Sequence, residues 1–218
     1  MKTRTVLIIA LAAVSGLGSC AVGRKMSFTN KEADPGYTTS KSATVIFQDK
    51  RAEVLAGKEK TTFCGHSNST GQISYNIQTE SGNPLADEFA GSVTAAYNKA
   101  GGTATTILVN MNTSSDSIIQ VFKAGTKDRL LYFTIDKWES RATPLFSSIR
   151  YEVIYELELN VYNPAGTLLA SNKTQNIVVK EEGVATSMKK MQAMADDTFK
   201  EQVRVLFSSN AVKKSLIE

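Results

Sequence analysis

The most regular alternation of polar and apolar side chains lies between residues 149 and 161. A period of two is typical of a β-strand that buries one face and leaves the other in water. A turn over 163–166 and a second strand-like segment over 167–179 follow, so the pattern predicts a β-hairpin. The apolar set of the first strand consists of Tyr151, Val153, Tyr155, Leu157, Leu159 and Val161.

Three other segments have the composition of strands. Residues 43–48 are β-branched and aromatic and contain no glycine or proline, and residues 106–109 form a short apolar run. Residues 129–138 are apolar on both sides, which predicts a central strand covered on both faces. Its two apolar sets are Leu131, Phe133 and Ile135, and Leu130 and Tyr132.

Helical spacing of apolar residues occurs three times. The first predicted helix has Asn83 as its N-cap and Pro84 in its first turn, and it ends at a glycine pair. The second covers 114–125, beginning at a serine and ending at a glycine. The third runs from about 187 to 208, with methionine, phenylalanine and leucine on its buried side.

Residues 52–82 have the weakest pattern in the chain. Glycine and polar residues dominate, although Ile73, Tyr75 and Ile77 alternate as they would in a short strand. The segment is too long for a plain connection between two elements. It is therefore either an additional hairpin or a functional loop.

The order of the predicted elements is β-α-β-α-β-β-β-α. The first strand, helix and strand are expected to form a right-handed crossover, and the later hairpins add antiparallel strands. These elements predict an α+β fold in which a single mixed β-sheet is packed on one face by helices.

The N-terminus has the form of a bacterial lipoprotein signal. Lys2 and Arg4 precede an apolar run over 6–14, which is much shorter than the roughly 20 residues of a membrane-spanning helix. Leu17, Gly18 and Ser19 then resemble a lipobox in front of Cys20, the thiol that would receive diacylglycerol. An ordinary secretory signal or a retained signal anchor is the alternative.

This interpretation divides the chain into three parts. Residues 1–19 are a signal peptide, residues 20–42 are a lipidated cysteine and a flexible tether, and residues 43–218 are one globular domain. Ala21 stands where an aspartate would favour retention in the inner membrane. We therefore expect an anchor in the outer membrane, with the domain facing the periplasm.

Charge and cysteine content restrict the function classes. Lysine and arginine total 25 and aspartate and glutamate 21; loss of Lys2 and Arg4 with the signal leaves 23 − 21 = +2. Charges of both signs are interspersed, which argues against a nucleic-acid-binding protein. Of the 2 cysteines, Cys20 would carry lipid, so Cys64 has no partner for an internal disulfide. The pattern predicts no cofactor.

Cys64 and His66 form the only cysteine–histidine cluster of the sequence. A thiolate next to an imidazole can attack an acyl group, but the sequence shows no third residue that would orient the pair. As a metal site, the pair supplies two ligands where about four are needed. We therefore predict neither a catalytic site nor a metal site there.

Four residues at the ends of two strands are candidates for contact with a partner. Asp49 and Arg51 follow the first strand, where a local cap or a surface ion pair is the alternative. Asp136 and Trp138 lie at the end of another strand, where the indole anchors a partner or packs over the sheet.

Four features of the sequence follow one another in a recognisable order: the triplet Asp49-Lys50-Arg51, AYNKAG followed by TTILV, LLYFTIDKW, and the turn NPAG. Their arrangement resembles small periplasmic lipoproteins of the YajG type. It also resembles the domain shared by the lipoprotein activator of a peptidoglycan synthase and the N-terminal part of the Tol-system propeller protein. The segment from Glu53 to Gly82 has no counterpart in them.

The predicted anchor, the tether, a complete core and the lack of an assembled catalytic set in the sequence together predict a non-catalytic envelope lipoprotein that binds a protein or an envelope polymer. The alternative is an accessory protein that carries a lipid or glycolipid, which requires an apolar cavity of several hundred Å³. A hydrolase using Cys64 and His66 is a third hypothesis. The sequence does not indicate an oligomeric state.

Overall fold

The computed structural model describes residues 24–31, 33–71, 73–183 and 185–218. The predicted signal peptide, with Leu17, Gly18 and Ser19, and the predicted lipidation site Cys20 therefore lie outside the described residues. The helices are α2 (Ala52–Leu55), α3 (Leu85–Lys99), α4 (Ser115–Lys123), α5 (Met188–Ser208) and α6 (Asn210–Ile217). The strands are β1 (Arg24–Met26), β2 (Ser42–Asp49), β3 (Phe63–Asn68), β4 (Ser74–Thr79), β5 (Thr103–Thr106), β6 (Arg129–Pro144), β7 (Ile149–Tyr162) and β8 (Leu168–Glu182).

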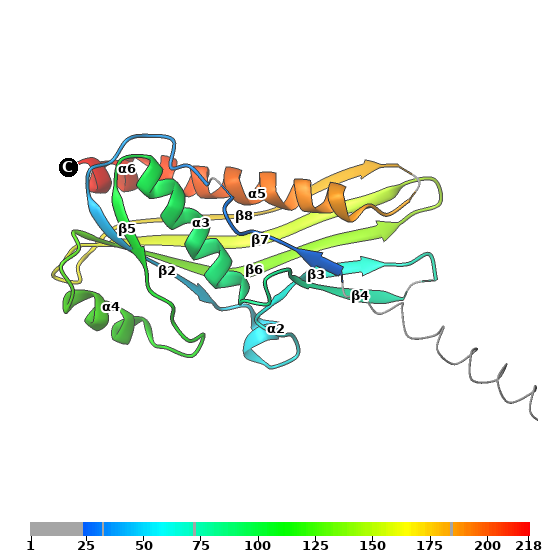
Figure 1. Ribbon diagram of the computed structural model, residues 1–218, viewed down its shortest axis with the longest axis horizontal. Helices are drawn as coiled ribbons and strands as arrows, with labels where there is room; N and C mark the ends of the chain where they lie inside the picture. The colour runs from blue at the N-terminus through cyan, green and yellow to red at the C-terminus, as the bar shows by residue number, and fades with distance from the viewer. Residues whose placement is uncertain (1–23, 32, 72, 184) are drawn as a thin grey trace, which may run out of the picture.

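All eight strands belong to one mixed sheet organised around the 16-residue strand β6 (Figure 1). Along one edge, β6 pairs in parallel first with β2, as far as Ile135, and then with β3, from Ser140 onward. Along its other edge it pairs antiparallel with β7, which pairs with β8. The mixed sheet and the α+β class are confirmed.

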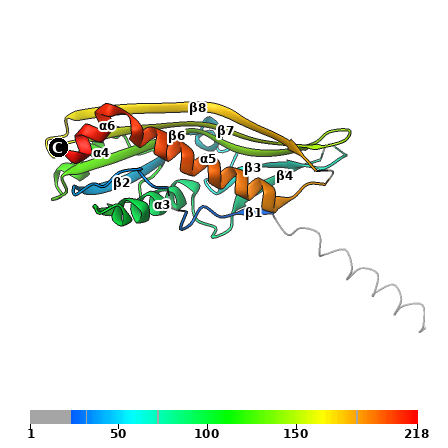
Figure 2. The ribbon, with the colours of Figure 1, turned by 90° about the horizontal axis from the view of Figure 1, so that it is seen from above.

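Helices α3, α5 and α6 pack on one face of the sheet and form the main core with it (Figures 1 and 2). A smaller cluster joins Ile118 and Phe122 of α4 to Leu130 and Tyr132 of β6, on the opposite face. The prediction that the strand beginning at residue 129 is covered on both sides is therefore confirmed, and α4 supplies the second cover.

Four aromatic rings from distant parts of the chain meet in the main core. Phe89 of α3 stacks on Phe199 of α5 with 4.1 Å between ring centroids, and Trp138 of β6 meets the Phe89 ring edge-on at 4.9 Å. Phe28 completes the group, 5.1 Å from Phe89. Contacts of this kind fix how the helices lie on the sheet.

The segment predicted as a tether over 20–42 is part of the folded domain from Arg24 onward, so that prediction is wrong for the described residues. β1 pairs in parallel with β4, and Met26 and Phe28 are buried. The Phe28 N–H donates to Glu88 Oε2 at 2.6 Å. The segment is mostly polar, but its few apolar side chains are the ones that enter the core.

Residues 52–82 contain the short helix α2 and the antiparallel hairpin β3–β4, so the hairpin alternative is confirmed. A bulge interrupts β3 between Phe63 and Gly65. Gly65 has a φ of 152°, and a Cβ atom there would lie 1.9 Å from the Ser140 carbonyl oxygen. Only glycine allows β3 to approach β6 this closely.

Two local predictions are wrong, and one helix was not predicted. Pro84, and not Asn83, occupies the N-cap position of α3, without a side-chain capping bond. The strand predicted over 106–109 is β5, displaced to Thr103–Thr106. The chain also continues after α5 into α6, because Ser209 adopts an extended conformation and accepts the Val212 N–H as a new cap.

Candidate functional site

Asp49 and Arg51 form a buried ion pair. The Arg51 guanidinium donates from Nε to Asp49 Oδ1 at 2.9 Å and from Nη2 to Oδ2 at 2.7 Å. Its Nη1 also donates to the carbonyl oxygens of Phe63 (2.7 Å) and Trp138 (3.3 Å). Arg51 is 0% exposed, so the side chain ties the end of β2 to β3 and β6 from inside.

This burial overturns the partner-contact prediction for Asp49, Arg51 and Trp138. The indole of Trp138 is fully buried among the aromatic rings of the core. Asp136 alone of the four remains partly exposed, with its carboxylate 3.8 Å from Lys173 Nζ. The three buried residues stabilise the fold, whereas Asp136 lies at the surface of the sheet.

The structure does not bring Cys64 and His66 together as a reacting pair. Cys64 is buried in the main core, its Sγ donates to the Thr62 carbonyl oxygen at 3.4 Å, and burial raises the pKa of its thiol. The His66 ring lies partly exposed on the other face of the sheet, with Nδ1 2.8 Å from Glu139 Oε1. The bulge between Phe63 and Gly65 places the two side chains on opposite faces of the sheet.

Glu139 is the centre of a charged cluster on the exposed side of β6. Arg141 donates to both carboxylate oxygens, from Nε at 2.6 Å and from Nη2 at 2.7 Å, and His66 contacts the same group. Burial alone would raise the pKa of Glu139. The hydrogen bonds from Arg141 and His66 outweigh it and hold the pKa below its ordinary value.

This cluster belongs to a larger surface, which we call the open face: the side chains of β3, β6, β7 and β8 that point away from α5. Two ion pairs cross neighbouring strands on it, with Lys173 Nζ 2.5 Å from Glu156 Oε1 and Arg150 Nη2 2.7 Å from Glu181 Oε1. The open face includes His66, Asp136, Glu139, Arg141, Arg150, Glu152, Ile154, Glu156, Lys173, Ile177, Val179 and Glu181.

Two aliphatic side chains lie among these ion pairs. Ile177 is 52% exposed and Val179 is 50% exposed, and Ile154 lies directly opposite Ile177 on the neighbouring strand. Neither Ile177 nor Val179 is among the residues predicted from the sequence to contact a partner. A signal was present, since β8 contains three consecutive aliphatic residues, and an alternating strand must turn at least one of them away from the core.

A cleft of about 350 Å³ lies at the carboxyl end of β2. β2 lies between β5 and β6, and the helices before and after β5, α3 and α4, pack on opposite faces of the sheet. Open sheets commonly bind ligands at the carboxyl ends of strands where the connections diverge in this way. Gln48 Nε2 holds one wall by donating to three loop carbonyl oxygens, the shortest distance being 2.6 Å to Thr113. Burial raises the pKa of Asp87 in the cleft.

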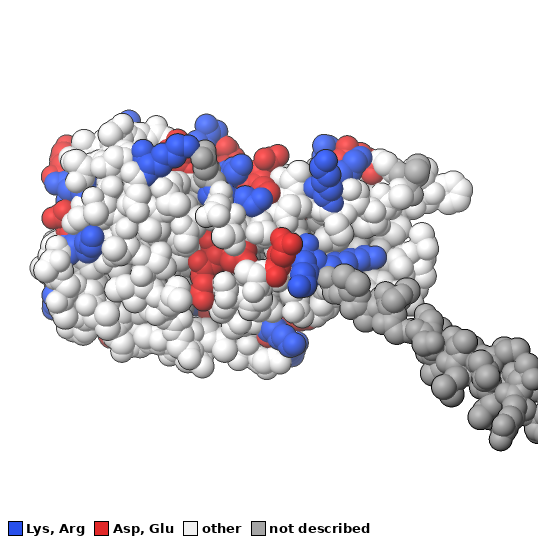
Figure 3. All heavy atoms as spheres, in the orientation of Figure 1, with Lys and Arg blue, Asp and Glu red and all other residues white. Residues whose placement is uncertain are grey.

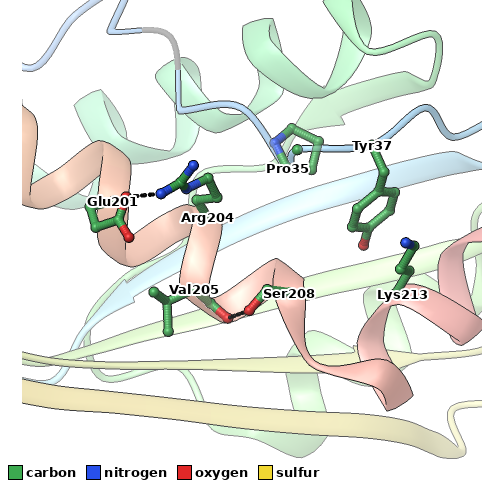
Figure 4. A pocket seen from close by; sticks show the side chains of 8 residues that line it. Pro35, Tyr37, Glu201, Arg204, Val205, Ser208 and Lys213 are labelled. Atoms are coloured by element: carbon green, nitrogen blue, oxygen red, sulfur yellow. Dashed lines mark hydrogen bonds and ion pairs between the residues drawn. The ribbon is translucent and has the colours of Figure 1, made fainter.

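A polar groove of about 400 Å³ separates residues 35–37 from α5 and α6 (Figure 4). Arg204 Nη2 is 2.6 Å from Glu201 Oε2, and Lys213 Nζ lies 5.6 Å from the centre of the Tyr37 ring. The Tyr37 hydroxyl is buried and has no hydrogen-bond partner among the described residues. Both cations of the groove are thus already engaged.

One cavity between α5 and the sheet, among the described residues, has a lining that does not favour the carrier hypothesis. It measures about 250 Å³, and four of its residues are charged: Lys180, Glu182, Lys190 and Asp197. A cavity for an acyl chain would be lined mainly by apolar side chains.

Two general features of the described residues concern membranes and metals. Among residues 24–31, 33–71, 73–183 and 185–218, no helix combines the length and apolar character needed to cross a bilayer. Within the same part of the chain, no three histidine, cysteine or acidic side chains are grouped as metal ligands.

No family model matches the sequence, and no curated protein matches it. Solved structures similar to this chain include an uncharacterized protein (8% identity, 88% of this chain and 98% of that chain covered, TM-score 0.44). Another is described as a candidate neuraminyllactose-binding hemagglutinin homolog from Helicobacter pylori (8%, 88% and 92%, TM-score 0.40). A third is a lipoprotein from Neisseria meningitidis (12%, 75% and 97%, TM-score 0.29). At these identities and TM-scores the likenesses assign this chain neither to a family nor to a function.

Proposed function

We propose that the protein is a lipid-anchored, non-catalytic binding module of the bacterial cell envelope, and that its open face receives a protein partner. Acylated Cys20 would hold the domain at the membrane, with the outer membrane, facing the periplasm, as the proposed location. The lipobox Leu17-Gly18-Ser19-Cys20 supports the anchor.

The observation that carries the binding role is the placement of apolar side chains on β8. Ile177 and Val179 point into water, while Asn172 and Thr174 point towards α5. A solvated edge strand is expected to have the opposite arrangement. Exposed aliphatic residues with a polar surround are typical of protein–protein interfaces, whose centre is apolar and whose rim is polar.

The charges of the open face favour a protein over an anionic polymer. Lys173, Arg150 and Arg141 each have a carboxylate within 2.7 Å. A polyanion would have to displace those carboxylates, whereas a protein surface can cover the aliphatic pair and leave the ion pairs at the rim.

The non-catalytic part of the proposal is supported by the positions of Cys64 and His66. The thiol is in the core with a raised pKa, and the imidazole is held by Glu139 on the opposite face. A nucleophile and its base would need to lie within hydrogen-bonding distance.

The experiment is site-specific photocrosslinking in intact cells. A photoreactive amino acid replaces Ile177, and the matched control replaces Val121, an exposed aliphatic residue on α4. We expect a discrete crosslinked protein from position 177 and none from position 121. Equal labelling at both positions, or none at 177 in cells that express the protein normally, would contradict the proposed surface.

The anchor is tested separately by mass spectrometry of the purified protein and by palmitate labelling. We expect acylation at Cys20 and its loss in Cys20→Ala. An unmodified N-terminus at another residue would refute the anchor, and turnover of an ester or a glycan that Cys64→Ser abolishes would refute the non-catalytic role.

A further inference from the structure

Exposed apolar side chains gather in the turns at one end of the sheet. Phe146, in the turn between β6 and β7, is fully exposed, and its neighbour Leu145 is 40% exposed. A hydrogen bond of 2.8 Å from the Leu145 N–H to the Ser148 carbonyl oxygen closes this turn. Ile73, which precedes β4 after the β3–β4 turn, is 58% exposed.

The strand registers place both turns at the same end. β3 is parallel to β6, with Gly65 beside Ser140, so the two strands end at neighbouring turns. Arg24 of β1 pairs with Ile77 of β4, and Ile77 pairs with Gly65 of β3. Because Gly65 lies beside Ser140, Arg24 and Ser140 are at the same level along the strands. β4 begins at the β3–β4 turn and runs away from it. Because β1 is parallel to β4, β1 also begins at its end nearer the two turns (Figure 1).

The turn with Phe146 extends well beyond the point where the described chain begins. Leu145 is five residues past Ser140, and a strand rises about 3.3 Å per residue, so the turn projects about 17 Å farther along the sheet than Arg24. Lysine and arginine side chains lie beside the start of β1 (Figure 3).

The distance from Cys20 to Arg24 is limited by covalent geometry. Three residues separate them, and a chain spans at most about 3.6 Å per residue, so their Cα atoms are at most about 14 Å apart. This is shorter than the projection of the turn. If Cys20 carries lipid, the domain cannot stand off from the bilayer in the way that a tether over 20–42 would allow.

We propose that the domain rests end-on against the membrane, with the turn containing Leu145 and Phe146 in the lipid interface and the β3–β4 turn beside it. The inference depends on the proposed acylation of Cys20. Aromatic and aliphatic side chains at loop tips suit this depth, where apolar groups enter the bilayer and polar ones stay among the headgroups. Tyr75, 43% exposed beneath the Arg24 guanidinium, suits the headgroup level.

The test measures where a fluorescent group lies relative to lipid. Full-length acylated protein carrying Phe146→Cys is labelled with a nitrobenzoxadiazole dye in vesicles of phosphatidylethanolamine and phosphatidylglycerol. The matched control is Leu168→Cys, an exposed leucine beside the turn at the opposite end of the sheet. Cys64 is buried, and labelling of the parent protein gives its background.

We expect emission from position 146 to be lost with nitroxide-labelled lipid and protected from aqueous iodide, and position 168 to behave in the opposite way. Quenching of position 146 by iodide to the same extent as position 168 overturns the inference. Protection of 146 from both quenchers also overturns it, because protein then covers the turn.

Mass spectrometry of the same samples separates the two proposals. Acylated Cys20 with a water-exposed position 146 overturns the end-on contact alone and leaves the binding module intact. A sample without acylation removes the anchor, and the end-on contact fails with it.

Discussion

Strands β7 and β8 are neighbours in one sheet, yet they distribute their side chains in opposite ways. β7 turns leucine, valine and tyrosine towards α5 and charged residues towards water. β8 turns Asn172 and Thr174 towards α5, where they hydrogen-bond to the helix, and exposes Ile177 and Val179 on the other side. On β8, therefore, polar contacts from Asn172 and Thr174 join Val178 in holding α5, and two aliphatic side chains, Ile177 and Val179, lie on the open face.

The largest effect is expected from the buried ion pair. Arg51→Met leaves the Asp49 carboxylate buried without its partner and should lower the free energy of unfolding by about 3–5 kcal/mol. Arg150→Met removes an exposed partner of Glu181 on the open face and should lower it by less than about 1 kcal/mol. Urea unfolding of both variants measures the difference; similar losses would mean that the Arg51 pair is accessible to water.

The comparison between β7 and β8 is tested next by shortening one aliphatic side chain on each strand. Leu157 is fully buried, so Leu157→Ala should destabilise by about 2–5 kcal/mol. Ile177 is half exposed, so Ile177→Ala should change the stability by no more than about 0.5 kcal/mol. Urea unfolding compares the two. A loss above about 1 kcal/mol for Ile177→Ala would show that its side chain supports the fold.

Elements long enough to repeat their pattern of buried and exposed residues could be predicted from the sequence. Short elements that depend on contacts with distant parts of the chain could not. β7 and α5 contain enough turns or alternations to reveal their buried sides. β1 has only three residues, too few for any periodicity, and it exists because β4 lies beside it.

The candidate site shows the same division. Asp49 and Arg51 stand at a strand end where charged residues are usually solvated, so their burial follows only from the fold. Two of the groups that hold Arg51 are the carbonyl oxygens of Phe63 and Trp138, which carry no sequence signal. The exposed aliphatic residues of β8 were visible as a pattern, but which side α5 covers depends on tertiary packing.

A smaller effect is expected from the polar contacts between β8 and α5. The Asn172 side-chain amide donates to the carbonyl oxygens of Val205 and Leu206, both at 3.0 Å, near the end of the helix. Asn172→Ala should lower the unfolding free energy by about 0.5–1.5 kcal/mol. Gln175→Ala, an exposed amide on the open side of β8, is the control and should have almost no effect in the same urea titration. Equal losses would remove the distinction between the two sides of the strand.

The smallest effect concerns Glu139, whose pKa is held below its ordinary value by Arg141 and His66. A carboxyl with a lower pKa in the folded state stabilises the protein above its unfolded pKa, and this contribution is lost as the pH falls through the folded value. Glu139→Gln should therefore reduce stability at neutral pH and flatten its dependence on pH below about 4.5, the ordinary glutamate value. Glu181→Gln, which removes a more exposed carboxylate of the open face, is the control. It should change the pH dependence of the unfolding free energy at acidic pH less than Glu139→Gln does. Unfolding free energies measured from neutral to acidic pH make the comparison. If the pH dependence of the unfolding free energy at acidic pH is the same in Glu139→Gln as in the parent protein, water screens this carboxylate as it screens its neighbours. The open face would then have no buried charge at its centre.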